Sequence, residues 1–184
     1  MKKQLLIGAG SEHSKRIPVN SSLKWTNLVT LDINADHNPD VVWDLTKLPL
    51  PFADNEFSEI HAYEVLEHIG QQGDYKTFFA QFSEFWRILE PNGGLAGTSP
   101  MWNSVWAWGD PSHTRVIQRA QFTFLDQSEY TRQVGKTAMS DFRYMYKADF
   151  QLPWFSEDNG SFAFLLQAIK PSRYLPPMRS ITIS

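Results

Sequence analysis

Residues 43–69, WDLTKLPLPFADNEFSEIHAYEVLEHI, decide the fold of this 184-residue chain. A short apolar run at 40–43 ends where this stretch begins. A second run, 58–62, lies in the middle of the stretch. We predict that each of these two runs is a strand. The prolines and the Asp-Asn pair between them are typical of turns. Polar side chains follow each predicted strand: Asp44 comes after the first, and the predicted helix after the second carries Glu64, Glu67 and His68.

The same pattern of short apolar runs and helical spacing extends to both sides and predicts an α/β sheet. Further strands are predicted at 4–7, 28–33 and 95–99, and near 148–152 and 162–169. One helix is predicted to begin at Tyr75, after the N-cap residue Asp74, and to end at the turn formed by 91–94. A second helix is predicted to follow the capping-box residues 126–129 and to end near Gly135.

Between the strand at 28–33 and the strand at 40–43 the linker is unusually short and rich in turn-forming residues. A parallel crossover normally needs a dozen or so residues, usually helical. We therefore expect a loop in place of the helix between the second and third strands.

Composition narrows the class of protein. With 42% hydrophobic and 20% charged residues the chain is typical of globular proteins. It has no cysteine, which excludes disulfides, thiolate metal sites and a cysteine nucleophile. Its five histidines are too far apart in sequence for a two-histidine metal motif, and no metal is expected. No apolar run approaches the roughly 20 residues of a membrane span, no signal peptide is recognisable, and we expect a cytoplasmic protein.

Two of the strand ends carry groups suited to a nucleotide-like ligand. Gly8-Ala9-Gly10 follows the first strand, where glycines permit a tight turn and close approach of a ligand to the backbone. Asp32 ends the second strand, and its carboxylate is able to accept hydrogen bonds from two ribose hydroxyls. Asp44 is able to accept from an exocyclic amino group. Alternatively, the glycines form a simple turn, Asp32 is a turn residue, and Asp44 caps a helix.

Four stretches together resemble the class I S-adenosylmethionine-dependent methyltransferases, in particular the small type 11 group. They are LLIGAG at 5–10, LVTLDIN at 28–34, the stretch at 43–69 and FWRILEPNGGLAGTSP at 85–100. The resemblance implies a Rossmann-like, doubly wound, mostly parallel seven-stranded sheet with an antiparallel last strand. It also implies one domain over 1–184, with a cofactor-binding half at 1–100 and an acceptor side at 101–184.

The resemblance also implies roles for single residues toward S-adenosyl-L-methionine. Two positions depart from the family. It often has an acidic residue where this chain has Leu6, and a glycine where this chain has Glu12. The implied contacts are Gly8, Ala9 and Gly10 under the methionine part, Asp32 on the ribose, Ile33 on the adenine face, Asp44 and Leu45 on the adenine edge, and Ala62 and Tyr63 near the sulfonium.

The segment 101–115 follows the fifth strand and is expected to overhang the site, because ligands of open α/β sheets bind beyond the carboxyl ends of the strands. We predict that its indoles, Trp102, Trp106 and Trp108, contact the substrate and that Arg115 contacts an anion. His113 is the predicted general base, with Asp110 as its partner. Alternatively, the tryptophans fill the core and Asp110 belongs to a turn. For His68, capping of the last helical carbonyls competes with a role as a base.

These observations predict an enzyme that transfers a methyl group by in-line displacement to an unidentified acceptor. Residues 1–112 carry 8 Lys/Arg against 14 Asp/Glu, and residues 113–184 carry 9 against 6, which favours a sugar-containing or anionic acceptor over a nucleic acid. No membrane partner is expected. A homo-oligomer and a partner subunit that completes the acceptor site both stay open. The alternatives are a catalytically silent subunit with the same fold and a nicotinamide-dependent oxidoreductase, for which the glycine pattern is wrong.

Overall fold

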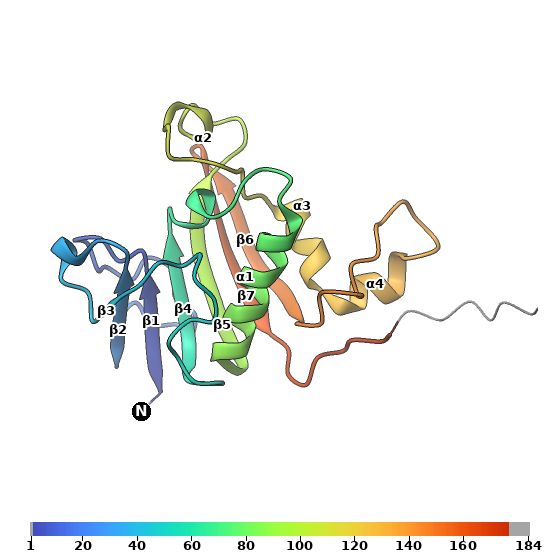
Figure 1. Ribbon diagram of the computed structural model, residues 1–184, viewed down its shortest axis with the longest axis horizontal. Coiled ribbons are helices and arrows are strands. Elements are labelled where there is room, and N and C mark those ends of the chain that lie inside the picture. The colour runs from blue at the N-terminus through green and yellow to red at the C-terminus, as the bar shows by residue number, and fades with distance from the viewer. Residues whose placement is uncertain (1, 177–184) are drawn as a thin grey trace, which may run out of the picture.

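One mixed sheet organises residues 2–176, which are the residues that the computed structural model describes; Met1 and residues 177–184 of the predicted domain lie outside them. Its strands are β1 (Lys3–Ile7), β2 (Leu28–Asp32), β3 (Val41–Val42), β4 (Phe57–Tyr63), β5 (Leu89–Pro100), β6 (Phe150–Asp158) and β7 (Ser161–Ala168). The strand order is β3-β2-β1-β4-β5-β7-β6, and β7 runs antiparallel to both of its neighbours. The predicted mostly parallel, seven-stranded sheet with an antiparallel last strand is therefore confirmed (Figure 1).

Helices cover one face of this sheet. α1 (Tyr75–Ile88), α3 (Arg119–Phe122) and α4 (Gln127–Gln133) lie on that face, and α2 (Trp106–Gly109) lies beyond the carboxyl ends of the parallel strands (Figure 1). α1 buries Phe78, Phe82 and Phe85 at helical spacing in the main apolar core. Its predicted N-cap is confirmed, because the Asp74 carboxylate accepts a hydrogen bond from the Thr77 amide at 3.1 Å. None of the helices within residues 2–176 has the length and apolar character needed to cross a bilayer.

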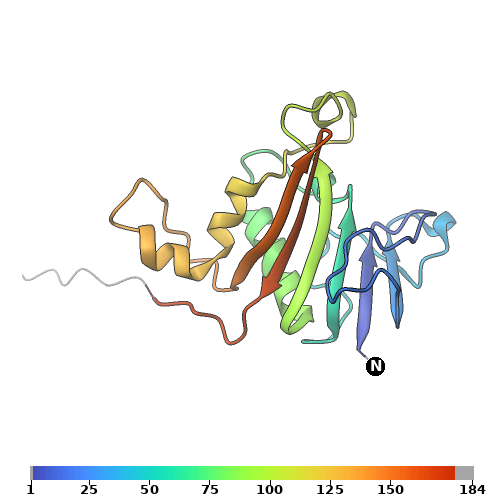
Figure 2. The same cartoon turned by 180° about the vertical axis from the view of Figure 1, so that it is seen from behind.

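The opposite face of the sheet carries no helix within residues 2–176. The connection from β1 to β2, residues 8–27, crosses this face as an irregular segment that we call the cover segment (Figure 2). The connection from β2 to β3 holds only the short 3₁₀ turn η1 (Ala35–His37), as the linker length predicted. The sheet thus keeps the Rossmann-like strand order while its helical layer is one-sided.

A buried carboxylate attaches the cover segment to the sheet. Glu59 on β4 points to the helix-free face, and its Oε2 lies 2.5 Å from Nζ of Lys15 and 2.9 Å from Nε2 of His61. Its Oε1 accepts from the side-chain amide of Asn20 at 3.1 Å. Burial by itself raises the pKa of Glu59, but the contacts with His61 and Lys15 outweigh it and lower the pKa to about 2. Glu59 is therefore ionised, and its charge is balanced by a lysine from the cover segment.

Tyr63 adds a second attachment on the same face. Its hydroxyl accepts hydrogen bonds from the backbone amides of Arg16 and Ile17 at 2.9 and 3.2 Å, and it lies 2.7 Å from Nδ1 of His61. Two consecutive amides of an irregular segment thereby find the acceptor that a helix would otherwise provide.

At the start of β5 the structure differs from the predicted turn. Leu89 pairs with Phe57, the following residues bulge outward around Asn92 with φ of 63°, and pairing resumes between Gly94 and Glu59. The predicted turn at 91–94 thus lies inside the strand as a bulge. The predicted start of α4 is confirmed by Asp126, whose carboxylate accepts from the Ser128 amide at 2.8 Å.

Substitution Lys15→Met should lower the free energy of unfolding at pH 8 by about 3–5 kcal/mol, because it leaves the Glu59 carboxylate buried without its cation. The loss should be smaller near pH 5.5. Burial, with a contribution from Lys15, holds the pKa of His61 below its usual value. Without Lys15 that pKa rises, and protonated His61 then replaces the missing charge. Urea unfolding at both pH values measures the difference.

Lys24→Met is the matched control, since Lys24 is an exposed lysine of the same cover segment. It should change the free energy of unfolding by less than about 0.5 kcal/mol at either pH. Equal effects of the two substitutions would contradict a structural role for the buried ion pair.

Candidate functional site

A cavity of about 440 Å³ opens at the carboxyl ends of β1, β2 and β4. Because these strands are parallel, their ends meet at one edge of the sheet, where the residues predicted to bind the cofactor gather. Apolar side chains form much of the wall, and the polar groups are few. The lining residues are Gly8, Leu31, Asp32, Ile33, Trp43, Asp44, Leu45, Thr46, Glu64, Val65, His68 and Ile69.

Gly8 and Asp32 line this cavity, and Asp32 also holds the turn that runs from Gly8 to Gly10. Gly8 and Gly10 have φ of +57° and +55°, a region that side chains disfavour, so the turn needs glycine at both positions. The Asp32 carboxylate accepts from the Gly10 amide through Oδ2 and from the Asn34 amide through Oδ1, both at 2.8 Å. Burial tends to raise the pKa of Asp32, but these bonds and nearby His37 lower it. An ionised carboxylate with spare lone pairs thus faces the cavity.

Asp44 serves a turn and still lines the cavity. Its Oδ1 accepts from the amide and the hydroxyl of Thr46, which lowers the pKa of the carboxyl. The described side-chain hydrogen bonds of Asp44 all use Oδ1, which leaves Oδ2 for a ligand. Leu45 lies beside it in the wall, and Ile33 is 68% exposed at the rim, available to pack against a flat ligand.

Four of the predicted cofactor residues, Ala9, Gly10, Ala62 and Tyr63, are not among the residues that line the cavity. Ala9 and Ala62 are buried, and the Tyr63 side chain points to the opposite face, where it holds the cover segment. Tyr63 therefore contacts the cover segment, which continues from the Gly8–Gly10 turn, and does not contact the cavity itself. The sequence could have predicted this orientation of Tyr63. Side chains alternate along a strand, so Tyr63 points to the same face as Glu59 and His61 and away from the face of Ala62.

A second cavity of about 310 Å³ adjoins the first, and Glu64 lines both. The other lining residues are Pro100, Ser104, Trp106, His113, Asn159, Gly160 and Ser161. Trp102, Trp106 and Trp108 are each more than half exposed, so they do not fill the core. Of the three indoles only Trp106 lines this cavity. Trp108 Nε1 instead donates to the Trp102 carbonyl at 2.8 Å, which fixes the shape of the overhanging loop.

His113 is positioned by the loop that carries it. Its Nδ1 lies 2.8 Å from the Trp106 carbonyl oxygen, which only accepts, so Nδ1 bears the hydrogen and Nε2 has a free lone pair in the neutral ring. Nε2 lies 3.8 Å from Oδ2 of Asp110. The amide and hydroxyl of Ser112 both donate to Oδ1 of Asp110 and lower the pKa of that carboxyl. The predicted pair of His113 and Asp110 is therefore brought together beside Trp106.

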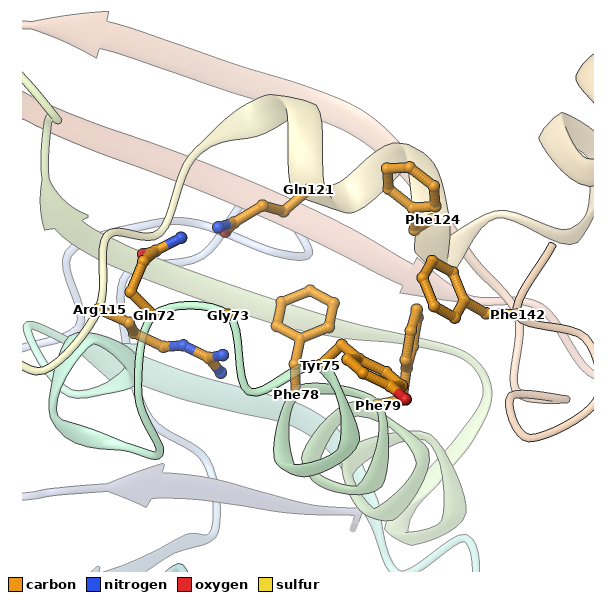
Figure 3. Close-up of a pocket in the computed structure, with 9 residues that line it drawn as sticks. All are labelled: Gln72, Gly73, Tyr75, Phe78, Phe79, Arg115, Gln121, Phe124 and Phe142. Atoms are coloured by element: carbon orange, nitrogen blue, oxygen red, sulfur yellow. The ribbon is translucent and has the colours of Figure 1, made fainter. Parts of the chain in front are cut away.

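Arg115 lies apart from this group. Its guanidinium donates to the carbonyls of Gln71 and Asp74 at 3.0 and 2.9 Å and lies over the Phe78 ring. Figure 3 shows it at a smaller pocket of about 160 Å³ beside the start of α1. That pocket is lined by Gln72, Gly73, Tyr75, Phe78, Phe79, Arg115, Gln121, Phe124 and Phe142. The predicted anion contact thus belongs to the helix-covered face, and the cavity beside Trp106 lacks this charge.

Sequence reasoning assigned no role to Glu67, which proves to be buried between the two cavities. The predicted helix after β4 is only the 3₁₀ turn η2 (Leu66–His68), and it directs Glu67 inward with 1% of its surface exposed. Burial, together with the neighbouring charge of Glu64, raises the pKa of Glu67 to about 8. A buried acid directly after a strand that ends at a cavity is typical of a functional site.

Comparison with known proteins identifies the fold. No family model and no curated protein matches the chain. Solved structures do match it at low identity. A methyltransferase from Archaeoglobus fulgidus that depends on S-adenosylmethionine (SAM) has a TM-score of 0.58 at 14% identity, over 90% of this chain and 86% of that one.

Two further structures agree with it. The N-methyltransferase NodS from Bradyrhizobium japonicum, in complex with S-adenosyl-l-homocysteine, has a TM-score of 0.54 at 12% identity, over 91% of this chain and 78% of that one. A putative type 11 methyltransferase from Sulfolobus solfataricus has a TM-score of 0.51 at 15% identity, over 91% of this chain and 85% of that one. The chain therefore has the fold of the SAM-dependent methyltransferases.

Proposed function

We propose that the chain is a SAM-dependent methyltransferase that binds its cofactor in the cavity at Asp32 and its acceptor in the cavity at Trp106. The observation that carries this proposal is the pair of adjoining cavities, which share Glu64 at the carboxyl edge of the sheet. The first has the donors and acceptors of a nucleoside site, and the second offers a separate place for a second substrate.

The first cavity fits an adenosine-bearing cofactor. Asp32 is held ionised and keeps lone pairs for two ribose hydroxyls, and Asp44 keeps Oδ2 for an amino group. Ile33 and Leu45 supply apolar surface for a flat base. A side chain at Gly10 would project into open space rather than against protein, which leaves room beside that backbone for a ligand. When bound, SAM supplies an electrophilic methyl group on a sulfonium sulfur.

The second cavity holds and orients the acceptor. Trp106 offers an exposed indole face, and Ser104 and Ser161 offer hydroxyls along the wall. The Trp106 carbonyl holds Nδ1 of His113, which leaves Nε2, with Asp110 3.8 Å away, to take a proton from a hydroxyl or amino group. Alignment of two bound partners across Glu64 contributes to the rate by proximity alone.

Of the sugar-containing and anionic acceptors expected from the sequence, the sugar-like class is the better supported. The carboxylates of Glu64 and Asp110 lie at or beside the second cavity, and they repel an anion. The cation that would attract one, Arg115, donates to backbone carbonyls in another pocket. An indole face and several polar groups suit a neutral acceptor rich in hydroxyls.

Substitution Asp32→Ala should weaken binding of S-adenosylhomocysteine by about 10–150-fold, because two hydrogen bonds to a charged group are lost. Isothermal titration calorimetry measures this directly. Asp36→Ala is the matched control, since Asp36 is an exposed aspartate of the adjacent η1 turn and should leave the affinity unchanged. A folded Asp32→Ala protein with unchanged affinity would contradict the assignment, and NADH binding in its place would favour the oxidoreductase alternative.

Substitutions Trp106→Ala and His113→Ala should lower turnover while the affinity for S-adenosylhomocysteine stays within about twofold, because the two ligands use different walls. For His113→Ala the expected loss is about 10²–10⁴-fold, the contribution of a general base. Release of S-adenosylhomocysteine on a panel of acceptors bearing hydroxyl or amino groups gives the turnover.

Trp154→Ala is the control for removing an exposed indole, because Trp154 lies on β6 and not in the loop. It should keep full turnover. Loss of cofactor affinity in step with turnover would place the loop on the cofactor wall. Binding of S-adenosylhomocysteine without turnover on any acceptor would favour the catalytically silent alternative.

A further inference from the structure

We propose that Glu67, His68 and His113 bind a divalent transition-metal ion, Zn²⁺ by donor type, between the two cavities. No metal was expected from the sequence, because His68 and His113 are far apart in the chain. The fold brings them together, and one ligand atom from each of the three residues lies within 4.8 Å of the others. The two imidazole rings meet edge to face with centroids 4.6 Å apart.

Both histidines carry the hydrogen bond that fixes a metal-binding tautomer. Nδ1 of His113 lies 2.8 Å from the Trp106 carbonyl oxygen, and Nδ1 of His68 lies 3.2 Å from the Ser112 carbonyl oxygen. A carbonyl only accepts, so each Nδ1 bears the hydrogen and each neutral ring keeps a bare Nε2. Histidine ligands of metals usually donate their other ring N–H to a carbonyl or carboxylate in this way.

Glu67 supplies the second, independent observation. It is buried, yet neither oxygen of its carboxyl group has a hydrogen-bond partner among residues 2–176. Buried polar groups are nearly always paired, because an unpaired one loses its hydration without compensation. One ligand atom each from Glu67, His68 and His113 faces the others, and with Glu67 ionised all three are acceptors. A cation is the partner that satisfies such a set.

The spacing favours an ion over a direct ion pair. Nε2 of His113 lies 4.0 Å from Oε1 of Glu67. A protonated imidazole that donates to a carboxylate lies at about 2.7–2.9 Å. Two ligands of one zinc ion, each at about 2.0–2.2 Å from the metal, are separated by about 3–4 Å. The observed gap is therefore wide for a hydrogen bond and of the right size for a shared ion.

The donor set indicates the kind of metal. Two imidazoles and one glutamate suit Zn²⁺ and similar transition metals, whereas Mg²⁺ prefers oxygen ligands. Three protein ligands leave a coordination position open, which is the arrangement of catalytic rather than structural zinc sites. His68 lines the first cavity and His113 lines the second, so the open position lies where the two substrates meet.

The consequence for the acceptor rests on the proposed function. An ion at this place would hold a hydroxyl oxygen of the acceptor and lower the pKa of that hydroxyl, which makes oxygen the acceptor atom. His113 would then act as a ligand of the ion instead of as a general base, and the Trp106 carbonyl on Nδ1 would orient it.

The test measures Zn²⁺ binding to the full, untagged chain by calorimetry, with Mg²⁺ as the comparison ion. We expect one Zn²⁺ per chain and much weaker Mg²⁺ binding. His68→Ala should weaken Zn²⁺ binding by more than the roughly 10–100-fold that loss of a ligand's outer hydrogen-bond partner costs. His68 is exposed, so this variant should fold. Glu67→Gln, checked for folding by circular dichroism, should have a similar effect.

His13→Ala is the matched control for adventitious binding, because His13 lies in the cover segment and outside the cluster. It should leave Zn²⁺ affinity unchanged. Equal Zn²⁺ affinity in the wild-type protein and the His68→Ala variant, or no Zn²⁺ binding at all, would overturn the proposal.

Binding of S-adenosylhomocysteine, measured separately in the presence of a chelator, distinguishes the two proposals. Zn²⁺ binding without cofactor binding retains the metal site and removes the methyltransferase. Cofactor binding without Zn²⁺ binding removes the metal site and leaves His113 as the base.

Discussion

The buried carboxylate of Glu59 is the constraint on which one half of the molecule depends. It lies on the face of the sheet that carries no helix among residues 2–176, and a chain without helical hydrogen bonds crosses that face. Lys15 and Asn20 reach the carboxylate from this chain, and Tyr63 accepts two of its backbone amides. Apolar contacts of Ile17 and Val19 complete the attachment. Polar contacts on β4 thereby do the work that an amphipathic helix does on the opposite face.

The two edges of the site differ in what positions them. The edge proposed to bind the cofactor is held by the sheet itself: the Asp32 carboxylate at the end of β2 accepts from the amide of Gly10 after β1, so neighbouring parallel strands fix each other's ends. The edge proposed to bind the acceptor depends on a loop whose own contacts, such as that between Trp108 and the Trp102 carbonyl, hold it above the sheet. Glu64, with φ of +54° directly after β4, stands at the point where the two edges meet.

Much of this architecture could be predicted from the sequence, because it depends on local patterns. Apolar runs with polar ends located the strands, Asp74 located the start of α1, and the short linker after Asp32 excluded a helix there. The rest depends on contacts between distant residues. In the cover segment Pro18 and the cluster Asn20-Ser21-Ser22 disfavour a helix, but no local pattern shows that Glu59 holds this segment, and nothing local pairs His68 with His113. Arg115 was grouped with the tryptophans by proximity in sequence, but the chain turns at Thr114, whose amide binds the Glu67 carbonyl, and Arg115 faces α1.

The one-sided helical layer has a consequence for the order in which the chain acquires structure. α1 and its neighbouring strands are close in sequence and share the large apolar core. Because these contacts are local, we expect this region to form early in folding and to be the most stable part. The cover segment gains few contacts until β4 is in place, and we expect it to be the unit that opens at lowest free energy and exchanges its amide hydrogens fastest. Since the Gly8–Gly10 turn begins that unit, we expect occupancy of the adjoining cavity to be thermodynamically linked to closure of the cover segment. A ligand would tighten the helix-free face from the opposite side of the sheet.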